Sequence, residues 1–374
     1  MVSTPVKTIV IVGGGHASLP VIKMGKKWRR RNIEIKLISA HPFLIYSGAL
    51  PQYMAGFYQW NQTTVNLELL CKRYDVSFTA DKVISVDRDQ KFITTSSGVK
   101  ISYDALLLNV GSTTQPIIDG ANVSPVKPMS ELLELRKKIL NGSVKHLLIA
   151  GGGAAGTELA LNLSHPALTN RPQITLAEKN DNILSKFPKK LSTKVTAILN
   201  NRGVTTLTNH NISNNEKEKF DHIILAAGNR AESTPIHHDF DVGASGRILT
   251  EKNLLVKGET HVFAAGDTAD VDGNNYRQIG VHAVKQGVVL RHNMRAALLN
   301  KPLNTYKPYF TNPLIISNGP DSAFYVTNKL TLQGRIYAIL KYILDMRWLD
   351  KYTRIPENRR SVYRLLKEGL KRTV

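Results

Sequence analysis

Two glycine-rich stretches decide the fold: Gly13-Gly14-Gly15-His16-Ala17-Ser18 and Gly151-Gly152-Gly153-Ala154-Ala155-Gly156. Each follows a short aliphatic run, which is typical of a strand that turns tightly into a helix. Glycine permits the backbone angles of such a turn and the close approach of a pyrophosphate, which binds the free N–H groups where the helix begins. Two such turns predict two dinucleotide sites in one chain, and we expect electrons to pass between them.

The two copies differ at the positions that matter for binding. The third position of the motif is Ser18 in the first copy and Gly156 in the second. The second strand of such a domain normally ends in an acid that binds ribose hydroxyls, and Glu178 supplies it only in the second copy. Ser39 stands there in the first, so adenosine must be held differently. Glu178 favours NADH over NADPH through like-charge repulsion, although Lys179 weakens that inference.

The strand and turn that follow each glycine motif are also repeated. Residues 98–112 and 220–230 each hold an aromatic-Asp pair, an apolar run and a small-residue turn, at Gly111 and Gly228. The sequence therefore predicts two Rossmann-like α/β domains. The alternative is a protein with one cofactor, in which the other glycine loop binds nothing.

Composition limits the chemistry. At 374 residues, with 42% hydrophobic and 21% charged residues, the chain can bury large cores and fold as two or three domains. Its one cysteine, Cys71, excludes a disulfide framework, a cysteine metal site and a redox-active cysteine pair. We expect Cys71 to be a half-buried packing residue in a helix, and we expect no metal site.

The order of these motifs resembles the pyridine nucleotide-disulfide oxidoreductase superfamily. Within it, the chain resembles the branch without the disulfide, which contains type II NADH dehydrogenases and apoptosis-inducing-factor-like flavoproteins. A narrower resemblance is to the NADH-dehydrogenase-like flavoprotein associated with selenide, water dikinase. It is carried by residues 13–17, 46–51, 53–56, 111–113, 125–128, 280–287, 302–306 and 340–345. The chain has no kinase domain, so the resemblance implies the oxidoreductase module alone.

The resemblance implies two sets of cofactor-binding residues. For FAD these are Gly13, Gly15, His16, Ala17, Ser39, Gly111, Ser112, Asp267 and Ala283. For NADH, or less favourably NADPH, they are Gly151, Gly153, Gly156, Glu178 and Gly228. Asp267 would contact the ribityl chain of the flavin; alternatively it is a helix N-cap. FAD is expected rather than FMN because the first turn suits an adenine dinucleotide.

Three residues are catalytic candidates by the same resemblance. Glu158 ends a Gly-x-Glu motif that orients the hydride donor near nicotinamide and flavin; alternatively it is a first-turn glutamate stabilised by the helix dipole. Lys285 stands where type II dehydrogenases have the second glutamine of their quinone motif, and Val281 replaces the first. Lys285 would face a quinone or the reduced flavin. His282 would deliver protons, or simply pack.

The chain is strongly basic, with a net charge of +21 and a pI near 9.9. The last forty residues alone carry +7, and residues 336–348 repeat apolar side chains at helical spacing up to Trp348, with Lys341 among the surrounding polar residues. This pattern indicates a basic amphipathic helix with an interfacial Trp on an anionic membrane, or a helix that packs in the fold or on a second subunit. No nucleic-acid motif accompanies the charge, so nucleic acid is not expected.

We expect an FAD-binding domain at residues 1–122 and 241–301, an inserted NAD(P)H-binding domain at 123–240, and a C-terminal α+β region at 302–374 that ends in basic amphipathic helices. The expected function is FAD-dependent oxidation of NAD(P)H with reduction of an external acceptor, most reasonably a quinone. The alternative is a redox-sensing flavoprotein with low turnover. No signal peptide or membrane-spanning run is visible, so we expect a cytoplasmic protein, free or peripheral to the membrane.

Overall fold

The computed structural model describes residues 5–114, 116–231, 236, 239–272, 280–308, 313–355 and 358–372. It groups the chain into two compact units. The first unit comprises Met1–Leu44, Val65–Thr113 and Arg230–Phe310, and the second comprises Ile45–Thr64, Thr114–Asn229 and Thr311–Val374. The domain boundaries expected from the sequence stay a prediction.

The first unit is built on a five-stranded sheet in the order β18-β9-β1-β2-β5. All neighbours are parallel, and the strands are β18 (Val262–Ala264), β9 (Ala105–Leu108), β1 (Lys7–Val12), β2 (Ile33–Ser39) and β5 (Ser77–Ala80). From β1 the chain moves to β2 on one side and later returns to β9 on the other. Ligands of open α/β sheets bind at such a switch point, at the carboxyl ends of the strands.

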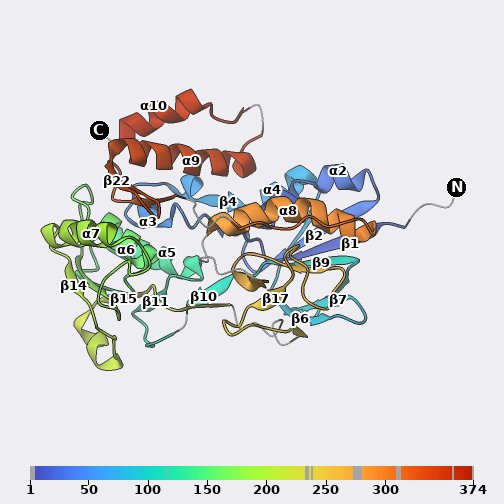
Figure 1. The fold of residues 1–374 in the computed structure, drawn as a ribbon, viewed down its shortest axis with the longest axis horizontal. Coiled ribbons are helices and arrows are strands. Elements are labelled where there is room, and N and C mark those ends of the chain that lie inside the picture. Colours follow the sequence, from blue (N-terminus) through green and yellow to red (C-terminus); the bar gives the residue numbers. More distant parts are fainter. Residues whose placement is uncertain are drawn as a thin grey trace. The chain divides into compact units, whose positions relative to one another are not determined.

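Smaller elements complete the first unit. An antiparallel sheet contains β6 (Val83–Asp87), β7 (Phe92–Thr95) and β8 (Lys100–Ser102), and β17 (Ile248–Thr250) pairs with β19 (Ala269–Val271). The helices are α1 (Leu19–Ile22), α2 (Gly25–Arg29), α4 (Leu67–Tyr74), α8 (Gly280–Leu298) and the 3-10 turn η5 (Gly266–Thr268). The long helix α8, which is labelled in Figure 1, packs against α1. Three short strands stand near the unit limits: β3 (Phe43–Ile45), β4 (Thr64–Asn66) and β10 (Ser112–Thr114).

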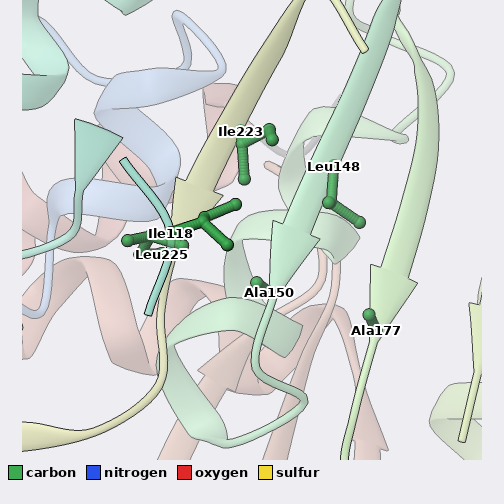
Figure 2. Close-up of a cluster of buried hydrophobic side chains, with 6 residues drawn as sticks. All are labelled: Ile118, Leu148, Ala150, Ala177, Ile223 and Leu225. Atoms are coloured by element: carbon green, nitrogen blue, oxygen red, sulfur yellow. The ribbon is translucent and has the colours of Figure 1, made fainter. Parts of the chain in front are cut away.

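The second unit repeats the architecture with the strand order β11-β15-β12-β13-β14. These parallel strands are β11 (Val123–Pro125), β15 (His222–Leu225), β12 (His146–Ala150), β13 (Gln173–Ala177) and β14 (Thr205–Leu207). Figure 2 shows the core on this sheet, where six buried side chains cluster: Ile118, Leu148, Ala150, Ala177, Ile223 and Leu225. The predicted Rossmann-like α/β fold with two parallel sheets is confirmed.

The second unit also contains several helices and a second, antiparallel sheet. The helices are α3 (Leu50–Met54), η1 (Trp60–Gln62), η2 (Met129–Glu131), α5 (Leu132–Leu140), α6 (Ala154–Leu163), α7 (Lys189–Asn201) and η3 (Asn214–Lys219). Strand β16 (Asn229–Ala231) lies at the unit limit. The antiparallel strands β20 (Leu314–Ser317), β21 (Ala323–Val326) and β22 (Thr331–Gly334) form the C-terminal sheet. This sheet lies within residues 302–374, the region expected from the sequence to be α+β.

The chain ends in two adjacent helices, α9 (Arg335–Thr353) and α10 (Val362–Arg372), which lie side by side in Figure 1. Arg360 links them through ion pairs with Asp350 (2.9 Å) and Glu368 (3.0 Å). For Trp348 the structure favours the packing alternative over the interfacial one. Trp348 is 8% exposed and stacks on Tyr46, with ring centroids 4.4 Å apart. Among the described helices, none is both long and apolar enough to cross a membrane.

Candidate functional site

The first glycine turn follows β1 at the switch point of its sheet. Gly13 has φ +92°, and a Cβ there would collide with the carbonyl oxygen of Asn109. The Ser18 hydroxyl donates to the Gly13 carbonyl (2.7 Å), and Asn109 Nδ2 donates to Ser18 Oγ (2.9 Å). Ser18, which departs from the usual glycine, therefore holds the turn closed. Sequence reasoning missed Asn109, although it directly follows β9, the strand that pairs with β1.

The residues expected to bind FAD after β9 and β18 meet in the first unit. Ser112 Oγ donates to Asp267 Oδ2 (2.8 Å), and Gly111 N donates to Thr268 Oγ1 (2.9 Å). Asp267 lies inside η5, whose N-cap is Ala265, so the alternative that Asp267 is the helix N-cap is wrong. The structure thus brings Gly111, Ser112 and Asp267 together beside the carboxyl ends of two neighbouring strands.

Helix α8 supports the same turn. Gln286 is buried, and its Oε1 accepts from the Gly266 amide (2.7 Å). Ala283 faces the turn too, since a Cβ on Gly266 would lie 3.5 Å from that of Ala283. Gln286 was missed by sequence reasoning, which considered only Val281 and Lys285 as replacements for the family's glutamines.

The other residues expected to bind FAD lie in the first glycine turn or at the end of β2. His16 and Ala17 lie in the turn before α1, and a Cβ on Gly15 would lie 2.6 Å from Asn109 Nδ2. Ser39, at the end of β2, donates its hydroxyl to the His41 carbonyl (3.0 Å). A binding role for these residues stays a prediction.

Two candidate catalytic residues, His282 and Lys285, lie in α8. His282 is buried, and its Nδ1 lies 2.6 Å from Tyr306 Oη. Burial, reinforced by Lys285, lowers the His282 pKa to about 4, so the ring is neutral near pH 7. Burial also lowers the pKa of Lys285. The geometry of His282 favours its packing alternative, and catalysis by either residue stays a prediction.

The second glycine turn follows β12 at the switch point of the second sheet. Gly151 has φ +123°, and a Cβ there would approach the carbonyl carbon of Ala226 to 2.8 Å. Gly153 is the N-cap of α6, Gly156 lies in its first turn, and Gly228 follows β15. A Cβ on Gly153 would meet no heavy atom within 4 Å, so the start of α6 is open to a pyrophosphate.

Glu178 is fixed beside this turn, directly after β13. Its Oε2 accepts from the Gly152 amide (2.8 Å) and its Oε1 from the Asn180 amide (2.9 Å). The side chain is therefore pre-oriented at the carboxyl end of its strand. This is the place at which the ribose of a dinucleotide is bound in such folds.

Glu158 lies in α6 of the second unit, and its side chain is half-buried. Its Oε1 accepts from the Ser317 amide (2.7 Å) at the end of β20. Burial raises the Glu158 pKa to about 7, although Lys341 and the Ser317 amide oppose this effect. Glu158 is thus poised to gain or lose a proton near neutral pH.

Lys341 of α9 is more deeply buried than its sequence context indicates. The sequence named it only among the polar residues around the apolar repeat of its helix, whereas it is 5% exposed in the structure. Its Nζ donates to Asp345 Oδ2 (2.9 Å), one turn further along α9, and to the Gly48 carbonyl. The i,i+4 spacing of Lys341 and Asp345 was a sequence signal of this pair.

The remaining chemistry of the described residues is limited. Cys71 is fully buried in α4 rather than half-buried, and burial raises its thiol pKa to about 12. No cluster of three or more His, Cys, Asp or Glu side chains that could hold a metal occurs in the part of the chain that the structure describes. The two glycine turns, with their bonded polar neighbours, fit two dinucleotides.

A family model supports the same conclusion from sequence. The model of pyridine nucleotide-disulphide oxidoreductases matches residues 7–287, which include both glycine turns. The chain belongs to this family. The narrower resemblance, to the flavoprotein associated with selenide, water dikinase, stays a prediction.

Individual family members are similar over nearly the whole chain. The type II NADH:quinone oxidoreductase of Staphylococcus saprophyticus is 23% identical, with 92% of this chain and 96% of that protein covered. The Haemophilus influenzae enzyme of the same name is 22% identical, with 90% and 92% covered. Among solved structures, NDH2 from Plasmodium falciparum in complex with NADH is 14% identical, with a TM-score of 0.76 and 98% and 97% covered. The structural likeness supports the fold.

Proposed function

We propose that this protein is an FAD-dependent NADH dehydrogenase that reduces a quinone. The observation that carries the proposal is the duplicated glycine turn, each copy at the switch point of its own parallel sheet. Relatives named type II NADH:quinone oxidoreductase, similar from end to end, support the choice of donor and acceptor. The net reaction is NADH + H⁺ + quinone → NAD⁺ + quinol.

The second glycine turn would bind NADH. The amides at the start of α6 would receive the pyrophosphate, and Glu178 would accept hydrogen bonds from ribose hydroxyls. Since the Glu178 carboxylate is already held by two backbone amides, it would bind ribose without rearrangement. A 2′-phosphate would meet its negative charge, which favours NADH over NADPH.

The first glycine turn would bind FAD through Gly13, Gly15 and the bonded group of Ser112 and Asp267. When bound, FAD supplies the hydride chemistry, because it accepts two electrons from a nicotinamide and releases them to an acceptor. The protein's part is to hold the cofactor and manage protons. With one cysteine in the sequence, no internal cysteine pair would intervene between flavin and acceptor.

Glu158 would manage one of these protons. A carboxyl with a pKa of about 7 can hold a proton and release it within the physiological range. Lys341 would stabilise its ionised form from within the same unit. Hydride transfer carries one of the two hydrogens that the quinone gains, and Glu158 would help supply the other.

The C-terminal helices would contact an anionic membrane, where quinones dissolve. Six apolar side chains of α9 and α10 are 38–69% exposed: Ile336, Leu344, Val362, Tyr363, Leu366 and Leu370. Basic residues accompany them in both helices. Exposed apolar side chains beside Lys and Arg are the combination that interfacial helices use.

Anaerobic flavin spectroscopy tests the proposal. The purified protein should contain FAD, NADH should bleach its absorbance, and a soluble quinone should restore it faster than oxygen or one-electron dyes. Protein without flavin, or flavin that NADH does not bleach, would contradict the proposal. Rapid bleaching with slow reoxidation by every acceptor would instead favour the redox-sensing alternative.

A further inference from the structure

Asn109 directly follows β9 and lies against two turns of the first unit that carry expected FAD residues. The residue is buried, with 4% of its surface exposed. A Cβ on Gly15, in the first glycine turn, would lie 2.6 Å from Asn109 Nδ2. A Cβ on Gly266, directly before Asp267, would lie 2.9 Å from Asn109 Oδ1. The Asn109 side chain therefore lies close to the backbone of both turns.

Two consecutive hydrogen bonds connect Asn109 to the first glycine turn. Asn109 Nδ2 donates to Ser18 Oγ (2.9 Å), and the Ser18 hydroxyl donates to the Gly13 carbonyl (2.7 Å). Ser18 is fully buried, so the loss of either partner would leave a polar atom that water cannot reach. Through Ser18, the Asn109 amide thus holds the glycine turn in its shape.

Helix α8 holds the turn before Asp267. The Gly266 amide donates to Gln286 Oε1 (2.7 Å), and Gln286 is 1% exposed. A Cβ on the next residue, Gly287, would lie 2.6 Å from the carbonyl oxygen of Ala17, so α8 also approaches the first glycine turn closely. Gly266 accordingly has two buried side-chain amides as neighbours, those of Asn109 and Gln286.

The second glycine turn has a pair of small residues in place of this polar pair. Gly156 stands at the motif position of Ser18, and Ala226 directly follows β15 as Asn109 follows β9. A Cβ on Gly156 would collide with the Gly151 carbonyl oxygen and would lie 3.1 Å from the Ala226 Cβ. The two turns thus differ at both positions together, which indicates that Ser18 and Asn109 act as a pair.

The first site has a particular need for a preformed turn. Ser39 stands where the ribose-binding acid is expected, and its hydroxyl already donates to the His41 carbonyl (3.0 Å). Binding of a dinucleotide there depends more strongly on the glycine turn. A turn that is fixed in advance binds more tightly, because it needs no ordering when the ligand arrives.

We propose that Asn109 is a positioning residue for FAD. Together with Ser18 and Gln286, it holds the first glycine turn and the turn before Asp267 in one arrangement, which slows the release of FAD. The assignment of FAD to the first turn rests on the function proposed above. The second turn, without this polar pair, suits a coenzyme that leaves after each turnover.

FAD release from the holoprotein tests the proposal. After dilution, free FAD is followed by its fluorescence, with neither NADH nor quinone present. Asn109→Ala should release FAD about tenfold faster than the wild type, because a buried hydrogen bond is lost and its acceptor is left unsatisfied. If this variant is purified without flavin, titration with FAD should give a Kd about tenfold higher. A release rate or Kd within about twofold of the wild type overturns the proposal.

A second buried asparagine separates positioning from general stability. Asn293 of α8 is fully buried, and its side chain bonds the backbone of Asn253 and Asn304. Asn293→Ala should lower the midpoint of urea unfolding but keep FAD release within about twofold of the wild type. If Asn293→Ala releases FAD as fast as Asn109→Ala, the positioning role is overturned.

Ser18→Ala keeps the proposal falsifiable if Asn109→Ala does not fold. It interrupts the same hydrogen bonds and should also speed FAD release by about tenfold, so an unchanged rate contradicts the proposal. Where both single variants fold, the double variant should release FAD no faster than about the faster of the two, because they remove one connected set of bonds. Additive effects would contradict the pairing of Ser18 with Asn109.

These measurements are independent of the proposed reaction, since donor and acceptor are absent. If the holoprotein contains FAD but reduces no quinone, the proposed function fails while the release rates still decide the role of Asn109. If the protein reduces quinones but Asn109→Ala retains FAD as firmly as the wild type, the positioning role alone fails.

Discussion

Single residues set the properties of the two dinucleotide turns. At the first turn Ser18 stands in place of the third glycine and accepts a hydrogen bond from Asn109. At the second turn the Gly152 amide holds Glu178 in a fixed orientation. Both contacts follow from the strand order, because each joins the end of one strand to the turn that follows the neighbouring strand. Substitutions at such positions therefore have specific expected effects.

Replacing Glu178 by Gln should alter coenzyme choice. The substitution keeps the side-chain shape but removes the charge that would repel a 2′-phosphate. We expect the ratio of kcat/KM for NADH to that for NADPH to fall about tenfold, equivalent to about 1.4 kcal/mol. Steady-state kinetics with both coenzymes measures this ratio. Glu134→Gln, at an exposed glutamate of the same unit that pairs with Lys137, is the control; an equal change there would contradict a specific role.

Replacing Gly13 by Ala should produce protein with little flavin. The added Cβ would collide with the Asn109 carbonyl and displace the turn. Gly98→Ala is a matched control, because Gly98 also has positive φ (+83°) but no heavy atom within 4 Å of an added Cβ. It should lose only about 1–2 kcal/mol from backbone strain and keep its flavin. Flavin absorbance per protein provides the measurement, and full flavin content in Gly13→Ala would refute the expectation.

At the scale of elements, the sequence predicted the local pattern of strands, turns and helices but did not decide between alternatives that depend on tertiary packing. Both parallel sheets were predictable because apolar strands, glycine turns and following helices are short-range patterns. For helix α9 the sequence left the membrane and packing alternatives open, since the partners of Trp348 and Lys341, which are Tyr46 and Gly48, come from the distant N-terminal part of the chain. The i,i+4 spacing of Lys341 and Asp345 indicated only that these two side chains could pair.

The packing of α9 can be tested at Trp348. Truncation to Ala would remove the stack on Tyr46 and leave a cavity, so the free energy of unfolding should fall by about 3–5 kcal/mol. Tyr363→Ala in α10, where the side chain is 66% exposed, should change it by less than about 0.5 kcal/mol. Urea unfolding followed by circular dichroism gives both values. A Trp348 variant as stable as the wild type would mean that this stack contributes little.

At the scale of the whole molecule, a net charge of +21 acts together with the exposed apolar side chains at the C-terminus. Electrostatic attraction works over about 8–10 Å at physiological salt, whereas apolar contact acts only after arrival. The two contributions should therefore respond differently to salt and to substitution.

Vesicle sedimentation should separate them. We expect binding to vesicles of phosphatidylglycerol, weakening as salt rises, and little binding to phosphatidylcholine. The double variant Leu366→Glu and Leu370→Glu should weaken binding about tenfold or more at every salt concentration, while Leu69→Glu, at an exposed leucine of α4, should have a small effect. Equal losses in the two variants would show that charge alone, and not the α10 surface, drives attachment.

The lone buried thiol offers an experimental advantage. Because Cys71 is fully buried and its pKa is about 12, maleimide and nitroxide reagents should leave it unmodified in the folded protein. A cysteine introduced at any exposed position would then be labelled selectively in the otherwise native sequence. Pairs of such labels would allow the distance between the two units to be measured, with and without NADH, by electron paramagnetic resonance.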